Sequence, residues 1–206
     1  SAIYGADAVA GVINIITRKS DAKPQTTLTL EAGQYGTQLM RLSTIGHEGD
    51  TGYFISLEDL RSEGFRDNGA YIGSNFILSV DQQVSPKDYI AMGMRHRSNE
   101  LDGWGLQKDQ NTSLDLTYDR ILSSTSDLTL SLYHEQTAMR YSDEYSDDKH
   151  RYQRTGLDLQ INNAFRSTPH LLTVGLVAES NKINSTKMPR DKKRTNWGIY
   201  GQDIYS

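Results

Sequence analysis

Two segments of this chain carry opposite charges and contain side chains that could bind a small ligand. Residues 140–151 contain four carboxylates and two tyrosines, and residues 180–196 contain six lysines and arginines. Cationic and aromatic groups together can bind an anionic, ring-bearing ligand. On this chemistry the candidate ligand contacts are Trp104, Arg140, Tyr141 and Arg190. The carboxylates could instead bind a hard divalent cation, and solvated loop faces are the plainer explanation of both charge runs.

Other chemistry finds little support in the sequence. It contains no nucleotide-binding loop, no G-x-S-x-G elbow and no H-E-x-x-H pattern, so we expect neither an enzyme nor a bound cofactor. Its five histidines are scattered, and a chain with no cysteine can form neither disulfides nor thiolate metal sites. We therefore predict no metal site. A net charge of −4 argues against a nucleic-acid partner, because such proteins usually present a basic face.

The elements that must position the candidate residues are β-strands. Apolar and polar residues alternate most clearly at 27–32, 113–118, 127–132 and 157–162, which is the pattern of strands with one apolar face. Further strands are expected at 38–46, 52–61, 71–83, 88–97, 171–179 and 197–205, giving about ten. Alternation predicts the side chains of one face to be Leu28, Leu30, Leu114, Leu116, Leu128, Leu130, Leu157, Leu159, Leu172 and Val174. It predicts the opposite face to contain Thr29, Asp115, Thr129, Ser131, Asp158 and Gln160.

The connections between these strands differ in length at the two ends. Short links are expected at 47–50, 84–87, 123–126 and 166–169, and longer ones at 62–70, 99–110, 140–151 and 180–196. Bacterial outer-membrane barrels have this asymmetry, with short periplasmic turns and longer extracellular loops. A soluble β-sandwich would show the same alternation along its strands. Only 36% of residues are hydrophobic, but a transmembrane strand exposes alternate residues to lipid and need not be apolar on average.

The first nineteen residues carry a more specific pattern. The small-residue segment with Tyr4, Gly5 and Asp7 is followed by an apolar run that contains Gly11 and Asn14 and ends at two basic residues. This order resembles the end of the plug domain in TonB-dependent outer-membrane receptors of the siderophore-receptor type. Residues 170–175 and 197–203 more loosely resemble barrel strands of that family. The resemblance divides the chain into the end of a plug, 1–19, and the first part of a transmembrane barrel, 20–206.

One position departs from the family pattern. Siderophore receptors commonly have a glutamate two residues after the glycine that corresponds to Gly175, and this chain has Val177 there. Val177 is predicted to face the lumen, where the family's carboxylate could hold arginines of the plug.

The resemblance implies an all-β fold, a partial antiparallel transmembrane barrel preceded by the last strand of a plug. It also implies a location in the bacterial outer membrane and uptake of a ferric siderophore or a similarly scarce ligand. Its partners would be the TonB complex, through an upstream region absent from this chain, and outer-membrane lipid with lipopolysaccharide, whose phosphates the basic segment could attract. Cobalamin, haem and glycans are alternative cargoes. The alternative function is a soluble or surface-displayed β-sheet binding protein, such as an adhesin, and a barrel enzyme is a third.

Overall fold

Ten antiparallel strands account for most of the chain. A computed structural model describes residues 23–165 and 168–205. The strands are β1 (Gln25–Ala32), β2 (Gln38–Glu48), β3 (Thr51–Ser62), β4 (Tyr71–Ser85), β5 (Asp88–Asp102), β6 (Leu106–Ser123), β7 (Ser126–Ser142), β8 (Asp147–Ala164), β9 (His170–Ser185) and β10 (Lys192–Tyr205). No helix within these described ranges is long and apolar enough to cross a membrane. The predicted plug segment, with Tyr4, Gly5, Asp7, Gly11 and Asn14, lies outside the described residues.

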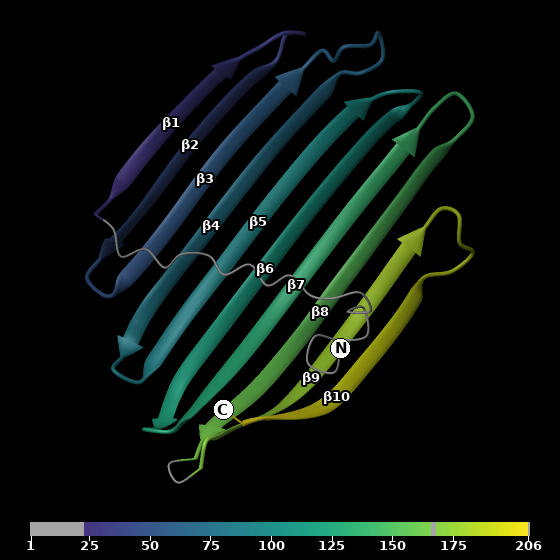
Figure 1. The fold of residues 1–206 in the computed structure, drawn as a ribbon. Coiled ribbons are helices and arrows are strands. Elements are labelled where there is room, and N and C mark those ends of the chain that lie inside the picture. The colour runs from purple at the N-terminus through teal and green to yellow at the C-terminus, as the bar shows by residue number, and fades with distance from the viewer. Residues whose placement is uncertain (1–22, 166–167, 206) are drawn as a thin grey trace.

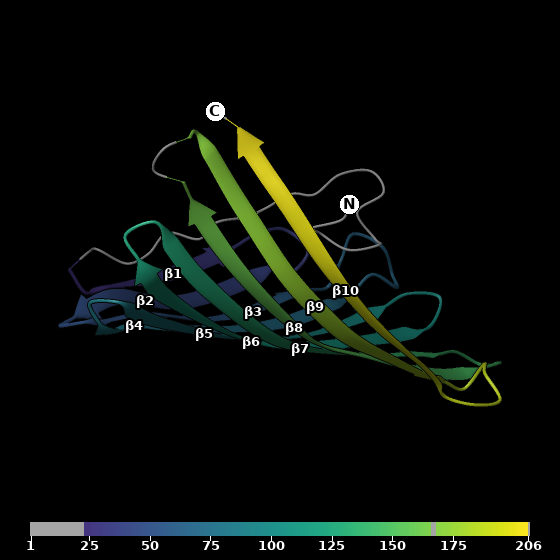
Figure 2. The same ribbon diagram turned by 90° about the horizontal axis from the view of Figure 1, so that it is seen from below.

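All ten strands form one sheet in which each strand pairs with its neighbours in the sequence (Figure 1). The sheet is open, because β1 and β10 each have a single partner strand. Seen from below, it curves into a trough (Figure 2). Such curvature follows from the right-handed twist of paired strands and is the geometry of a barrel wall. The predicted all-β, antiparallel barrel fragment of about ten strands is confirmed.

The strand register confirms the predicted faces. Residues directly opposite each other in an antiparallel pair point to the same side of the sheet. Leu28 lies opposite Leu42, and Leu130 lies opposite Leu159, so apolar side chains form continuous rows across the sheet. Thr129 lies opposite Gln160 on the other side. All ten side chains predicted for the apolar face share it, and the six polar ones lie on the opposite face.

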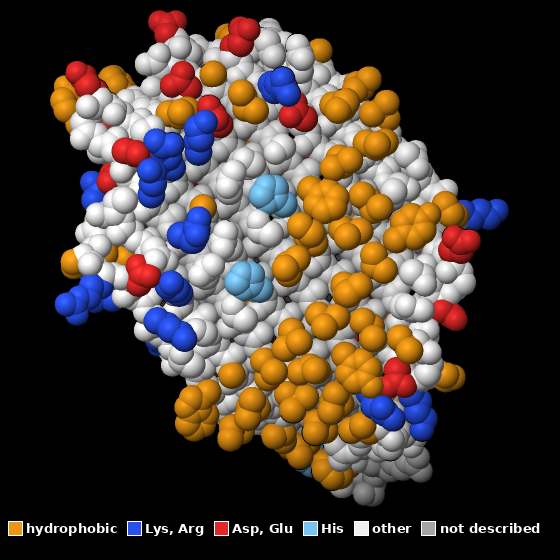
Figure 3. Space-filling model, turned by 180° about the vertical axis from the view of Figure 1, so that it is seen from behind, with side chains coloured by type: hydrophobic (Ala, Val, Ile, Leu, Met, Phe, Trp, Pro, Cys, Tyr) orange, Lys and Arg blue, Asp and Glu red, His pale blue; other side chains and the backbone are white. Residues whose placement is uncertain are grey.

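Within residues 23–165 and 168–205 the apolar side chains form no core. Leu30, Ile199 and Trp197 are 68%, 71% and 76% exposed, and among the described residues Tyr200 is the only buried large apolar side chain. Seen from behind, on the convex side, these side chains form a broad band that runs across the strands (Figure 3). Leaving a large apolar side chain in water forgoes about 1.5–3 kcal/mol of burial energy. The convex face therefore needs an apolar environment that the described residues do not supply.

Three of the four predicted long loops are shorter than expected, and for these the prediction is wrong, whereas the link 63–70 agrees with the predicted loop 62–70. β5 extends to Asp102 and β6 begins at Leu106, so only residues 103–105 link them. A loop over residues 99–110 was expected there. Likewise β7 and β8 leave only 143–146, and β9 and β10 leave 186–191. These strand ends carry polar side chains on both faces, so apolar and polar residues do not alternate there. Their backbones are nevertheless paired with the neighbouring strands. The longest of the described links at this end is 63–70.

Candidate functional site

The concave face is lined by polar side chains that satisfy one another across the strands. Arg41 Nε donates to Glu58 Oε2 at 2.6 Å, and these two residues are directly opposite in β2 and β3. Asn111 Nδ2 donates to Glu135 Oε1 at 2.9 Å and to Thr137 Oγ1 at 2.8 Å. Opposite charges and amide–carboxylate pairs in this arrangement stabilise the sheet. The concave surface is therefore a preformed polar wall.

A denser cluster lies on β7, β8 and β9. Glu179 Oε2 accepts hydrogen bonds from Tyr133 Oη at 2.8 Å and from Arg154 Nε at 2.5 Å, and Asn181 Nδ2 donates to Glu179 Oε1 at 2.6 Å. The Arg154 guanidinium also lies 5.3 Å from the centre of the Tyr133 ring. Gly156 lies directly opposite Tyr133, and a Cβ on Gly156 would come within 2.1 Å of Tyr133 Cζ. Only glycine leaves room for the ring to lie across the sheet and reach Glu179.

The cluster around Glu179 lies next to position 177, where this chain has Val177 in place of the glutamate common in siderophore receptors. Val177 lies opposite Asp158 and Gly198 on the concave face, as predicted. Glu179 is two residues further along β9 and so faces the same side. The concave carboxylate that the sequence lacks at 177 is thus present at 179, where Arg154, Tyr133 and Asn181 already engage it.

The four candidate ligand contacts do not form one cluster. Trp104 is 98% exposed at the tip of the 103–105 link. Tyr141 lies on the concave face of β7, and a Cβ on Gly105 would come within 2.8 Å of its ring, so Tyr141 and the Trp104 link are neighbours. Arg190 is exposed in the link 186–191. Trp104 and Arg190 are in links as expected, whereas Arg140 and Tyr141 belong to β7 and not to a loop.

Arg140 lies on the opposite face from Tyr141. It is directly opposite Lys108 and Lys149 on the convex face, because neighbouring residues of a strand alternate sides. Its Nε donates to Asp147 Oδ1 at 2.7 Å. Strand alternation alone places Arg140 and Tyr141 on opposite faces, which the predicted loop at residues 140–151 did not include.

An aromatic and cationic group that the sequence did not single out lies at the same end of the sheet. The Tyr35 and Phe65 rings pack edge to face at 6.5 Å, and the Arg66 guanidinium lies 5.1 Å from the centre of the Phe65 ring. Glu63 N donates to the carbonyl oxygen of Tyr35 at 2.8 Å, which ties the first two links at this end together. Tyr35 has a φ of 57° and precedes Gly36. This Tyr–Gly pair in a turn was the sequence signal that could have indicated the aromatic group.

The acidic side chains are held by the chain itself. Asp143 Oδ1 accepts hydrogen bonds from the backbone N–H groups of Tyr145 at 2.8 Å and Ser146 at 2.7 Å, and these bonds, the one from Tyr145 foremost, lower the pKa of Asp143. Asp148 Oδ2 lies 2.9 Å from Lys187 Nζ, which joins the acidic segment to the basic one. Within residues 23–165 and 168–205 no three His, Asp or Glu side chains are placed to hold a metal ion.

An open, curved antiparallel sheet with an apolar convex face and a polar concave face is a segment of a membrane barrel wall. No family model and no curated protein matches the chain in sequence. Solved structures share its fold. The siderophore receptor PirA from Pseudomonas aeruginosa is similar with a TM-score of 0.79 and 15% identity, over 98% of this chain and 38% of that one.

Two further solved structures are similar to this chain in fold. The siderophore receptor PiuA from Acinetobacter baumannii gives a TM-score of 0.77 at 12% identity, over 98% of this chain and 43% of that one. The unliganded ferric citrate transporter FecA gives 0.72 at 13% identity, over 100% and 39%. The chain thus spans about two fifths of the length of these structures. The predicted resemblance to TonB-dependent receptors is confirmed at the level of the fold, and all three neighbours are receptors or transporters, not enzymes.

Proposed function

We propose that this chain is part of a TonB-dependent outer-membrane receptor that takes up a ferric siderophore or a similarly scarce ligand. Residues 1–19 would be the end of its plug, and residues 20–206 the first part of its barrel. The observation that carries the proposal is the open ten-stranded sheet, apolar on its convex face and polar on its concave face, whose backbone is similar to that of solved siderophore receptors over 98% of the chain.

The absence of an apolar core among the described residues argues against the adhesin-like alternative. A soluble β-domain buries one face of each sheet against a second layer. Here a single layer leaves Leu28, Leu30 and Leu57 at least half exposed on the convex face. A lipid environment accounts for this exposure, and the concave polar wall would then line the barrel interior.

The ligand would enter from the end where Trp104, Tyr141 and Arg190 lie. The links at that end also carry the Tyr35, Phe65 and Arg66 group. These side chains supply exposed rings and guanidinium charge, which suit an anionic, ring-bearing ferric chelate. Arg140 has a weaker claim, because its side chain lies on the convex face.

The decisive experiment is uptake of iron-55 complexed to catecholate, hydroxamate and citrate chelators by cells that carry or lack the full-length gene. We expect one chelate class to require the gene, and uptake to vanish when TonB is deleted. Uptake that survives TonB deletion, or cells whose adhesion but not iron uptake depends on the gene, would refute the proposal. The variant Trp104→Ala should weaken uptake at low chelate concentration, whereas Lys87→Ala, in a turn at the opposite end, should not.

A further inference from the structure

A row of three metal-binding side-chain types crosses the concave face near the end that carries the links 103–105, 143–146 and 186–191. Asp109 of β6 lies directly opposite Met139 of β7, and Met139 lies directly opposite His150 of β8. Residues directly opposite each other in an antiparallel pair point to the same side of the sheet. A carboxylate, a thioether and an imidazole therefore lie side by side on three neighbouring strands.

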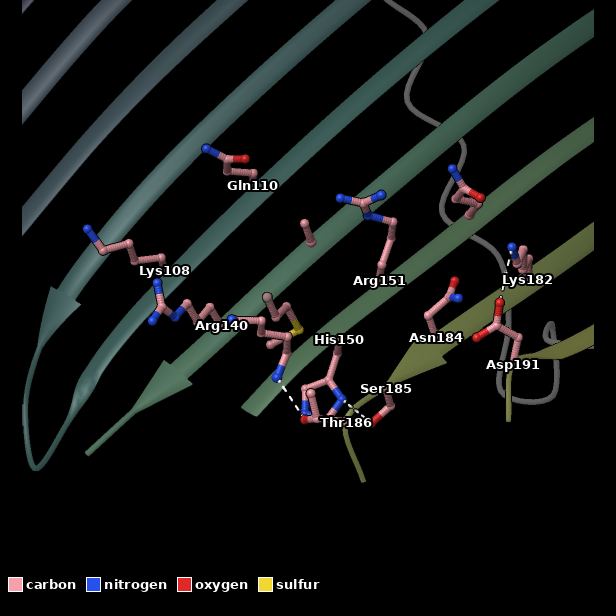
Figure 4. A pocket seen from close by; sticks show the side chains of 14 residues that line it. Lys108, Gln110, Arg140, His150, Arg151, Lys182, Asn184, Ser185, Thr186 and Asp191 are labelled. Carbon is pink, nitrogen blue, oxygen red and sulfur yellow. Dashed lines mark hydrogen bonds and ion pairs between the residues drawn. The ribbon is translucent and has the colours of Figure 1, made fainter. Parts of the chain in front are cut away.

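The imidazole of His150 is held by the next strand. Its Nδ1 lies 2.7 Å from Ser185 Oγ of β9, and Ser185 is directly opposite His150 in the same row (Figure 4). The ring is half-buried, and it forms no other hydrogen bond or ion pair with a described residue. A metal-binding histidine usually has one ring nitrogen hydrogen-bonded in this way, which fixes its orientation and leaves the other nitrogen for the metal. Here the nitrogen left for a metal is Nε2.

The carboxylate of Asp109 is satisfied on one oxygen only. Its Oδ2 accepts a hydrogen bond from Gln107 Nε2 at 2.7 Å. Its Oδ1 is buried without a hydrogen-bond partner, and no other buried side-chain nitrogen or oxygen within residues 23–165 and 168–205 lacks one. A buried polar atom without a partner is costly, and a bound cation is one of the few things that relieve the cost. Asp109 Oδ1 is thus an independent indication of a cation at this row.

Met139 is out of place as a packing residue. It is 43% exposed, and its neighbours on the concave face of β7 are Thr137 and Tyr141. An apolar side chain gains little in such a polar wall, because so much of it stays in water. Its thioether sulfur, in contrast, is a soft and polarisable donor.

The donor set identifies the metal. Thioether sulfur selects Cu(I), and imidazole also suits copper. Zinc sites use thiolate, imidazole and carboxylate, and calcium and magnesium sites use oxygen, so none of these metals accounts for the methionine. No three His, Asp or Glu side chains of the described ranges are placed to hold a metal ion, so a site in this row depends on the thioether.

We propose that Met139, His150 and Asp109 bind one Cu(I) ion on the concave face, through Met139 Sδ, His150 Nε2 and Asp109 Oδ1. At the usual strand spacing the backbones of Asp109 and His150 are about 10 Å apart with Met139 midway. The curvature of the sheet turns the concave side chains toward one another above Met139 (Figure 2). The sequence predicted no metal site, because these residues are far apart along the chain and only the register brings them together. The site uses none of the side chains proposed for the ferric chelate and does not depend on iron uptake.

The test measures Cu(I) affinity in the full-length protein, purified in detergent and stripped of metal with a chelator. Copper is added with ascorbate in the absence of oxygen, and bicinchoninate is the coloured competitor. Met139→Leu and His150→Gln should each weaken Cu(I) binding by at least about 100-fold, and Ser185→Ala by about tenfold, because loss of an outer-shell partner alone typically costs about 10–100-fold. The matched control is Met94→Leu/His96→Gln, which removes a methionine and a histidine from the convex face of β5 and should bind Cu(I) as the parent does.

X-ray absorption at the copper edge is the second readout. The parent should show a sulfur neighbour that Met139→Leu loses. This variant conserves side-chain volume, so the barrel should still fold, which heat-modifiable migration on a gel verifies.

Unchanged Cu(I) affinity in Met139→Leu and His150→Gln overturns the proposal, as does a loss of affinity confined to the convex control. Zn²⁺ binding as tight as Cu(I) binding and insensitive to Met139→Leu also overturns it, in favour of a site without the thioether. Uptake of ferric chelates by cells expressing the parent reports on the proposed function separately. Copper binding that depends on Met139 in a protein that takes up no iron would overturn only the ferric-chelate assignment.

Discussion

The assignment of the convex face to lipid predicts that two adjacent residues of β7 will respond very differently to the same substitution. Leu130 lies between Tyr118 and Leu159 in a convex row, and it is the middle of the three convex leucines 128, 130 and 132 on its strand. Ser131 lies on the concave face, directly opposite Asp158. We compare Leu130→Arg with Ser131→Arg in the full-length receptor.

An arginine at the bilayer midplane of a barrel costs about 2–4 kcal/mol. At about 1.4 kcal/mol per tenfold change, Leu130→Arg should raise the ratio of unfolded to folded protein by about 30- to 1,000-fold. Ser131→Arg should cost less than about 1 kcal/mol, because the new guanidinium faces the lumen and gains an opposed carboxylate in Asp158. The difference between the variants should therefore exceed about 1 kcal/mol.

The assay is the free energy of unfolding in urea, measured by tryptophan fluorescence on receptor folded into phospholipid vesicles. The dependence of that free energy on urea concentration should be the same for both variants, since neither changes how much surface unfolding exposes. Equal destabilisation by the two arginines would refute the lipid assignment. A larger cost at Ser131 would mean that the faces are inverted.

Three further predictions follow from the same structure. In the cysteine-free full-length receptor on intact cells, Trp104→Cys should react with an impermeant thiol reagent and Ser124→Cys should not, because their links lie at opposite ends of the sheet. Gly156→Ala should lower the free energy of unfolding by about 1–3 kcal/mol, because the new Cβ displaces the Tyr133 ring from its hydrogen bond. Because the pKa of Asp143 is lowered in the folded protein, its carboxylate stabilises the turn fully above the ordinary carboxyl pKa. This stabilisation should be lost as the pH falls through the lower pKa of the folded state. Hydrogen-exchange protection of the two backbone amides that donate to Asp143 would report the loss.

Controls for these predictions come from the same sheet. Gly198→Ala should be nearly neutral by comparison with Gly156→Ala, because its nearest neighbour, Val177 Cγ1, would be at an ordinary 3.5 Å. Labelling at Ser124 with protection at Trp104 would reverse the topology. Asp143→Asn should make the turn's amide protection independent of pH over the same range, and a persistent pH dependence would assign it to another group.

The faces of the sheet were determined by the sequence alone. A strand alternates its side chains with a period of two, so the leucines at 128 and 130 must share one face and the polar residues at 129 and 131 the other, whatever the strand pairs with. The number of strands followed from the turns between these alternating runs. The plug assignment rested on a local sequence pattern and stays a prediction.

The tertiary structure decided where the strands end and which side chains meet. Residues 99–102 and 106–110 have no continuous apolar face, so nothing local identified them as strands. They belong to the sheet because they pair with each other and with β4 and β7. Glu179 meets Tyr133 across 46 residues of sequence, a contact set by register and not by local pattern. Alternation depends only on the backbone of one strand, whose successive side chains point to opposite faces. Contacts between side chains of different strands depend on which residues the backbone hydrogen bonds align.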